Sequence, residues 1–297
     1  MTCFTGLSAF PITPAAPDGR VDTAALRALI APLAVAGVDS VGLLGSTGTY
    51  AYLSRAERRR ALDAALDEAG GQVPVIVGIG ALRTDEAVAL AQDARAAGAA
   101  AGLLAAVSYT PLTDEEVFEH FSAVATGSGL PICIYDNPGT THFRFTPSLV
   151  GRLAQVPGIR ALKSPAPDSD AVAGQLDALR RAVPAEFRLG YSGDWNAAEA
   201  LLAGGEAWYG VAAGLFPEPC LAILQAAQAG ETARARALNA RMQPLWDLFK
   251  EFSGLRVTYA AARHLGLCRT DPPRPILPLP EPVRNRVAEV VDRLALA

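Results

Sequence analysis

Lysine is almost absent from this chain of 297 residues. Lys and Arg together number 26, and reading along the chain finds only Lys163 and Lys250, so the other 24 are arginines. The formal net charge is −4, which excludes the strongly basic surface typical of nucleic-acid binding. No run approaches the roughly 18 uncharged apolar residues that a membrane-spanning helix needs. We therefore expect neither nucleic acid nor a membrane as a partner.

Cysteine and histidine are also scarce and widely spaced. Neither the three histidines nor the four cysteines form a CxxC pair or another metal-ligand pattern, which predicts free thiols and no metal or other cofactor. The first residues, MTCFTGLSAFPITP, lack the basic and apolar regions of a signal peptide, so we expect a cytoplasmic location. The cysteines are Cys3, Cys133, Cys220 and Cys268, and the histidines are His120, His142 and His264.

Short apolar runs alternate with alanine-rich amphipathic stretches along most of the chain. Asp22, Ser54 and Thr113 each stand where a helix start is expected. Eight such repeats predict an α/β fold, a (β/α)8 TIM barrel over residues 1–225, followed by a C-terminal helical extension over 226–297. The runs are residues 6–14, 40–45, 74–80, 101–107, 131–138, 159–165, 187–193 and 207–213.

The two lysines stand in different contexts. Lys250 lies in WDLFKEFSG, which reads as an exposed helix position, whereas Lys163 ends the apolar run IRALKSP. A buried lysine can lose its proton and attack a carbonyl, which arginine cannot do. Two interpretations of Lys163 remain open: a nucleophile, or a strand-end lysine that extends to solvent or pairs with Asp168.

Two further polar groups follow strands at the same predicted end of the barrel. Tyr135 ends the run before that of Lys163, so a phenol and an amine are expected about 5 Å apart on neighbouring strands. The turn GSTGTY (45–50) could direct amides and hydroxyls toward an anion. Each feature alone could be structural, but their convergence at one barrel face favours a site.

The segments GLSAFPITP, GSTGTY, YDNPGTT, ALKSPAPD and GYSGD follow one another as in the dihydrodipicolinate synthase and N-acetylneuraminate lyase family, which the whole chain resembles. The resemblance implies a class I aldolase that needs no cofactor and acts on pyruvate or a related small 2-oxo acid. Lys163 would form the Schiff base, and Tyr135 would shuttle protons. Ser46 and Thr47 would hold the carboxylate, and Tyr109 would complete a relay with Thr47 across subunits. The family's assemblies imply a homo-oligomer, a dimer or tetramer.

The chain departs from this pattern on the acceptor side. Thr140 occupies the position where dihydrodipicolinate synthases carry a carboxylate-binding arginine, and Pro165 and Pro167 follow the lysine. We therefore expect an acceptor other than aspartate semialdehyde, and we place Thr140 and Tyr209 among the substrate-binding residues. Two alternatives stay open: a true dihydrodipicolinate synthase in which a group such as Arg144 replaces the arginine, and a non-catalytic carboxylate-binding barrel.

Overall fold

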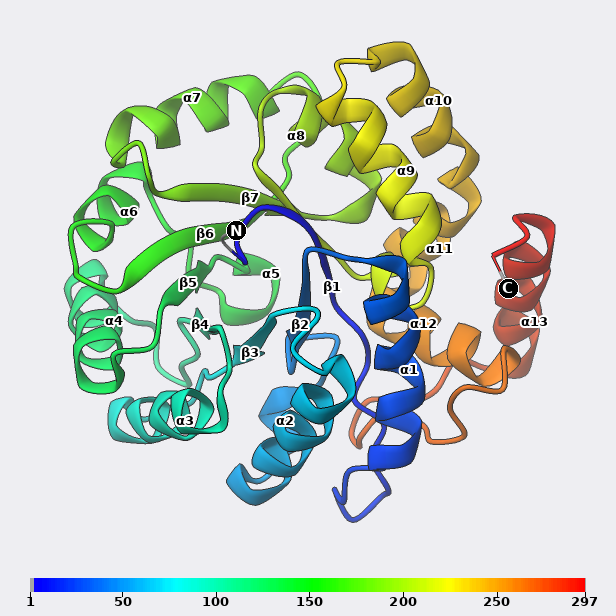
Figure 1. Cartoon of the computed structure of the whole chain (residues 1–297), viewed down its shortest axis with the longest axis horizontal. Coiled ribbons are helices and arrows are strands. Elements are labelled where there is room, and N and C mark those ends of the chain that lie inside the picture. Colours follow the sequence, from blue (N-terminus) through cyan, green and yellow to red (C-terminus); the bar gives the residue numbers. More distant parts are fainter. Residues whose placement is uncertain (1–2, 297) are drawn as a thin grey trace.

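The computed structural model describes residues 3–296 and shows a closed barrel of eight parallel strands in sequence order (Figure 1). Each strand falls within one of the eight predicted apolar runs, and the TIM-barrel prediction is confirmed. The strands are β1 (Gly6–Ala9), β2 (Ser40–Leu43), β3 (Val75–Gly78), β4 (Ala101–Ala105), β5 (Ile132–Tyr135), β6 (Ile159–Pro165), β7 (Arg188–Ser192) and β8 (Ala207–Gly210).

Helices surround the barrel and continue beyond it. The helices that follow strands pack outside the sheet, except the short α5, which is seen inside the ring of helices in Figure 1. They are α1 (Thr23–Ala36), α2 (Arg55–Ala69), α3 (Thr84–Ala97), α4 (Asp114–Ser128), α5 (Pro138–Thr141), α6 (Pro147–Leu153), α7 (Val172–Ala182), α8 (Ala197–Leu202) and α9 (Pro217–Gln228). The extension comprises α10 (Thr232–Arg241), α11 (Gln243–Phe252), α12 (Gly254–His264) and α13 (Glu281–Arg293). Short 3₁₀ turns are η1 (Tyr50–Tyr52), η2 (Asp194–Asn196) and η3 (Ala212–Gly214).

The predicted helix starts are confirmed by side-chain caps. Asp22 and Ser54 accept hydrogen bonds from backbone amides in the first turns of α1 and α2. Thr113 forms a reciprocal capping box with Glu116 at the start of α4. Such caps satisfy amides that have no partner within the helix, so the local sequence fixes where each helix begins.

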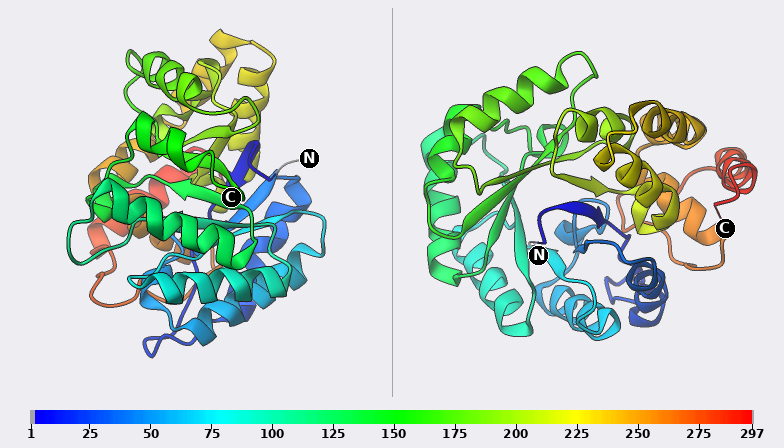
Figure 2. Two further views of the ribbon diagram at one scale, coloured as in Figure 1. Left: turned by 90° about the vertical axis from the view of Figure 1, so that its left-hand side faces the viewer. Right: turned by 45° about the horizontal axis from the view of Figure 1, so that its top comes forward.

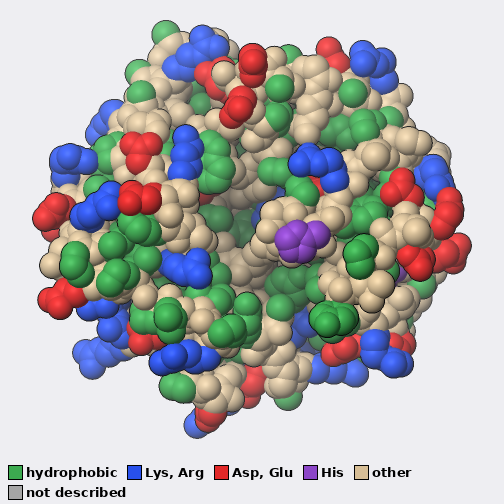
Figure 3. All heavy atoms as spheres, turned by 180° about the vertical axis from the view of Figure 1, so that it is seen from behind, with side chains coloured by type: hydrophobic (Ala, Val, Ile, Leu, Met, Phe, Trp, Pro, Cys, Tyr) green, Lys and Arg blue, Asp and Glu red, His purple; other side chains and the backbone are tan. Residues whose placement is uncertain are grey.

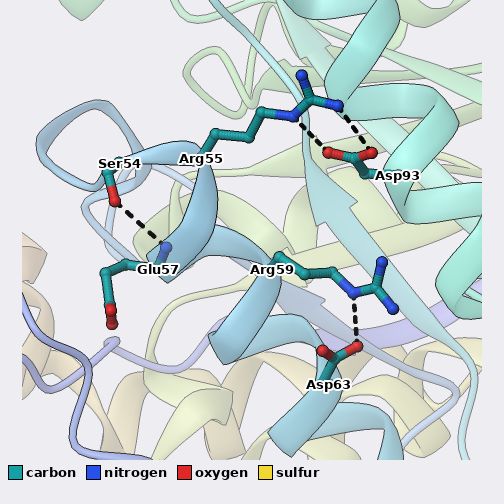
Figure 4. Close-up of polar contacts among 6 residues, drawn as sticks. All are labelled: Ser54, Arg55, Glu57, Arg59, Asp63 and Asp93. Atoms are coloured by element: carbon teal, nitrogen blue, oxygen red, sulfur yellow. Dashed lines mark hydrogen bonds and ion pairs between the residues drawn. The ribbon is translucent and has the colours of Figure 1, made fainter.

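Figure 4 shows two ion pairs of α2, one that reaches α3 and one within the helix. Arg55 forms a two-point contact with Asp93 of α3, at 2.5 and 2.8 Å. Arg59 pairs with Asp63 one turn along the same helix at 2.7 Å. These side chains are largely exposed, so each pair adds at most about 1 kcal/mol.

The C-terminal helices pack on the barrel rather than apart from it. α9 follows β8, closes the repeat and runs past the predicted boundary at 225, so the extension begins with α10. Trp246 and Val257 share one hydrophobic core with barrel residues such as Leu43. Figure 2 shows the extension along one side of the barrel. Among residues 3–296, no helix combines the length and apolarity needed to cross a bilayer.

Side-chain alternation on β6 decides which residues enter the barrel. Leu162 packs in the outer layer between sheet and helices, whereas Ala161 belongs to the cluster inside the barrel. Because successive residues of a strand point to opposite faces, Lys163 is directed inward like Ala161. Lys163 stands level with Tyr135 of β5 in the parallel register. The predicted amine and phenol are thus brought together on adjacent strands.

Candidate active site

A cavity of about 520 Å³ lies where the strands end, and both Lys163 and Tyr135 line it. The face opposite to the one seen in Figure 1 is hollowed near its centre (Figure 3). Ser46, Thr47 and Thr140 also line the cavity, so five of the seven residues predicted for the site meet there. Ligands bind at this end of the strands throughout the fold class.

Lys163 is held among aromatic rings. Its side chain is 3% exposed, and Nζ lies 3.5 Å from the ring centre of Phe10 and 4.3 Å from that of Tyr135. Burial lowers the pKa of Lys163 to about 7, with Cys133 and Asp194 opposing the change. An amine with this pKa is substantially neutral near pH 7, which is the form that attacks a carbonyl carbon. The structure gives Lys163 no contact with Asp168.

Phe10 reaches the lysine because β2 leaves room for its ring. A Cβ on Gly42 would lie 2.2 Å from ring atoms of Phe10, and one on Gly45 would lie 2.7 Å away. Both distances are far below van der Waals contact, so any larger residue would displace the ring. Gly42 and Gly45 therefore make room for the aromatic side chain that helps to desolvate Lys163.

The hydroxyl of Tyr135 lies in a triangle of polar atoms. Ser46 Oγ is 3.3 Å from Tyr135 Oη, and Asn137 Nδ2 donates to Tyr135 Oη at 3.0 Å and to Ser46 Oγ at 3.2 Å. Burial raises the pKa of Tyr135, and the hydrogen bonds from Ser46 and Asn137 oppose that rise. Ser46 is thus the residue of the 45–50 turn whose hydroxyl meets the phenol.

The loop after β2 presents polar groups to the cavity. The amide of Thr49 bonds the carbonyl of Ser46, whereas within residues 3–296 no backbone acceptor pairs with the amides of Ser46 and Thr47. Leu44 and Thr49, on either side of the turn, both have φ of 54°. Such angles are unfavourable for residues with a Cβ, above all for β-branched Thr49, and residues held in this way cluster at functional sites.

The far side of the cavity carries little charge. Among its described lining residues, Lys163 and Asp194 are the only charged side chains. Asp194 is already engaged, because its carboxylate accepts from the Trp208 indole and from the amides of Val211 and Ala212. The remaining wall includes aromatic, aliphatic and hydroxyl side chains. Thr140, Ser192 and Trp195 come from the barrel, and Phe249, Ser253 and Leu255 come from the extension.

Two predicted site residues lie elsewhere. Tyr209 is fully buried inside the barrel, where its hydroxyl accepts a weak bond from Cys133 Sγ at 3.7 Å, and it does not line the cavity. Its ring centre lies 5.7 Å from Lys163 Nζ, so Tyr209 packs beneath the site, and its role in substrate binding stays a prediction. Tyr109 is 98% exposed after β4 and lies outside the cavity of its own chain. Within the described chain, no group of three or more potential metal-ligating residues occurs.

Comparisons with known proteins agree with the motifs. A model of the dihydrodipicolinate synthetase family matches residues 3–294. A 4-hydroxy-tetrahydrodipicolinate synthase of Methylococcus capsulatus is 38% identical over 250 residues, which cover 84% of each chain. The crystal structure of dihydrodipicolinate synthase from Agrobacterium tumefaciens is 58% identical, covers 98% of both chains and has a TM-score of 0.96. The enzyme structure from Aquifex aeolicus is 26% identical, with 99% coverage of both and a TM-score of 0.91.

Proposed function

The chain belongs to the dihydrodipicolinate synthetase family, and from this premise we propose that it is a Schiff-base-forming aldolase or hydro-lyase that acts on pyruvate or a related 2-oxo acid. The observation that carries the proposal is the pairing of Lys163 and Tyr135. A buried amine with a pKa of about 7 stands in register with a buried phenol at the mouth of the barrel. A site that only binds carboxylates gains nothing from an amine that is neutral near pH 7.

In the proposed reaction, the neutral amine of Lys163 adds to the ketone carbon of the substrate. Loss of water from the resulting carbinolamine gives an iminium ion, which withdraws electrons from the adjacent carbon. A carbon–carbon or carbon–oxygen bond at the neighbouring positions can then form or break through an enamine. Tyr135 is the proposed proton carrier, since its ring centre is 4.3 Å from Nζ and its phenol lines the same cavity.

The loop after β2 is the proposed site for the carboxylate of the 2-oxo acid. Within the described part of the chain the amides of Ser46 and Thr47 have no backbone acceptor, and both residues line the cavity. Amide donors and hydroxyls arranged in this way stabilise an anion. Binding there would direct the ketone carbon of the substrate toward Lys163.

We propose that the second substrate, the acceptor, is an aldehyde that carries no carboxylate. Thr140 lines the cavity where an arginine would pair with such a group, and the described wall offers no guanidinium. Arg144, the candidate replacement, is exposed and does not line the cavity. The names of the relatives favour the alternative, 4-hydroxy-tetrahydrodipicolinate synthase activity. Charge complementarity at the acceptor side argues against it, because a desolvated carboxylate requires a partner.

We also propose that the chain functions as a homo-oligomer, with Tyr109 serving a neighbouring site. Large apolar or aromatic side chains are exposed after three successive strands, namely Tyr52 after β2, Leu82 after β3 and Tyr109 after β4. Because the strands are parallel and adjacent, these residues lie toward the same end of the barrel. Light scattering of the chain and of a Tyr109→Ala variant tests this proposal.

Borohydride trapping tests the proposed chemistry. Incubation with pyruvate or another 2-oxo acid, followed by reduction, is expected to yield an adduct on the peptide that contains Lys163 and none in Lys163→Ala. Turnover is then measured with uncharged aldehydes and with aspartate semialdehyde. No adduct across a panel of 2-oxo acids would favour the carboxylate-binding barrel, whereas efficient condensation of aspartate semialdehyde would establish the synthase instead.

A further inference from the structure

Asn137 stands at a junction between the two hydroxyls of the site. Its Nδ2 atom donates to Tyr135 Oη at 3.0 Å and to Ser46 Oγ at 3.2 Å, so each of its two N–H groups has an oxygen acceptor. Ser46 and Tyr135 lie on different strand ends, 89 positions apart in sequence. The fold brings the hydroxyls of Ser46 and Tyr135 near each other, and the Asn137 side chain sets their spacing.

The backbone leaves this side chain free for the task. Asn137 occupies the N-cap position of the short helix α5, where an asparagine side chain usually accepts from the helix amides, but it makes no such bond. Its backbone carbonyl instead accepts from the amides and hydroxyls of Thr140 and Thr141. Pro138 follows directly and disfavours helical angles at Asn137, whose φ is −142° and ψ is 67°. The cap is satisfied by the backbone, and the side chain turns into the site.

Resting on the proposed function, we propose that Asn137 is a positioning residue that completes the proton relay of Tyr135 within one chain. When the carbinolamine on Lys163 breaks down, its nitrogen lone pair forms the C=N bond and the C–O bond breaks. The phenolic proton of Tyr135 passes to the departing oxygen, which leaves as water. The products are an iminium cation on Lys163 and a phenolate on Tyr135, so charge and atoms balance.

The phenolate is the species that Asn137 stabilises. Before proton transfer, Tyr135 Oη accepts one N–H from Asn137 while its own proton points elsewhere. Afterwards the same N–H becomes a hydrogen bond to an anion, which is about twice as strong as one between neutral groups. Ser46 can rotate its hydroxyl to donate as well. Tyr109 of the same chain is exposed and makes no such contact, so the described relay within one chain is Asn137, Ser46 and Tyr135.

The test compares the rate of imine formation among variants of this residue. Rapid quenching with borohydride after mixing with pyruvate measures the rate constant between pH 6 and 9. Asn137→Asp keeps the size but removes both N–H donors and adds a negative charge, and we expect a fall of roughly 10- to 100-fold. The reduced adduct should still form on Lys163. Asn137→His restores one ring N–H and should recover a large part of the loss, whereas Asn137→Ala should not.

Controls separate this role from a structural one. Asn239→Asp changes another half-buried asparagine, whose Oδ1 accepts from Trp246, and should leave the rate within about twofold of wild type. Tyr135→Phe gives the reference rate of imine formation when the phenolic hydroxyl is absent. Equal rates in wild type and Asn137→Asp, or equal losses in the Asp and His variants, would overturn the inference while Lys163 trapping still supports the proposed function. Absence of any wild-type adduct would overturn both.

Discussion

Replacing Lys163 by methionine should stabilise the protein, and by an amount that depends on pH. Burial lowers the pKa of Lys163 from 10.5 to about 7 in the folded chain, whereas the unfolded chain retains the ordinary value. Between pH 7 and 10.5 the unfolded state therefore binds a proton that the folded state has lost. The free energy of unfolding rises with pH in this window, and below it the folded state carries the full cost of the buried amine.

The size of the effect follows from the pKa change. At about 1.36 kcal/mol for each tenfold change in the proton equilibrium, the buried amine costs at most about 5 kcal/mol at low pH. The free energy of unfolding of the Lys163→Met variant should exceed that of wild type by up to about 4.6 kcal/mol at pH 6.5 and by about 1.4 kcal/mol at pH 9.5. Because Lys163 borders an open cavity and not the dry interior, we expect roughly half of these values.

Urea unfolding at pH 6.5, 8 and 9.5 measures this gap, at one protein concentration so that subunit association does not enter the comparison. Lys250→Met is the matched control, because it alters the other lysine at an exposed position on α11, and it should change the free energy of unfolding by less than about 0.5 kcal/mol. A gap between Lys163→Met and wild type that stays constant with pH, or that has the opposite sign, would refute the reasoning about the buried amine.

Two further predictions concern the acceptor side of the cavity and a buried arginine behind Tyr50. Thr140→Arg should raise kcat/KM about tenfold or more for aldehydes that carry a carboxylate, because a guanidinium pairs well with that group. Uncharged aldehydes should gain nothing. Steady-state assays with charged and uncharged aldehydes of matched size measure the difference, and equal effects on both would contradict the prediction. Arg58→Met should lower the free energy of unfolding by about 2–4 kcal/mol in urea, because Arg58 is buried beside Tyr50 and donates to the carbonyls of Gly78 and Gly80. A loss below about 0.5 kcal/mol would show that water replaces those bonds.

The barrel could be predicted because each of its units is locally encoded. Apolar runs of strand length alternate with helices whose starts are marked by Asp22, Ser54 and Thr113, and a parallel sheet with such spacing has few arrangements open to it. The meeting of Lys163 and Tyr135 followed from the same logic. Residues that end neighbouring parallel strands must lie near each other, whatever the loops do.

Side-chain direction within a turn or a strand was harder to predict. Nothing in GSTGTY distinguishes Ser46 from Thr47 as the partner of the phenol, because the choice depends on turn angles such as φ of 54° at Thr49. Tyr209 stands on the inner face of β8, where its ring packs edge-on against Phe10 and beneath the residues that line the cavity. Asn137, before a proline, looks like an ordinary helix cap in the sequence, and only the structure shows its side chain at the site.

The two halves of the cavity are built from different parts of the fold, and this bears on where substrate choice resides. Lys163 and Tyr135 lie on strands paired in register with their neighbours, so the half of the cavity proposed to form the imine can change little without loss of the barrel. Thr140 lies on a short helix after β5, while Phe249 and Leu255 come from the extension, outside the sheet. Loops and appended helices accept substitutions that strands do not. A family with this division can keep imine formation while the acceptor changes, so an arginine replaced by Thr140 is expected to alter the substrate and not the chemistry.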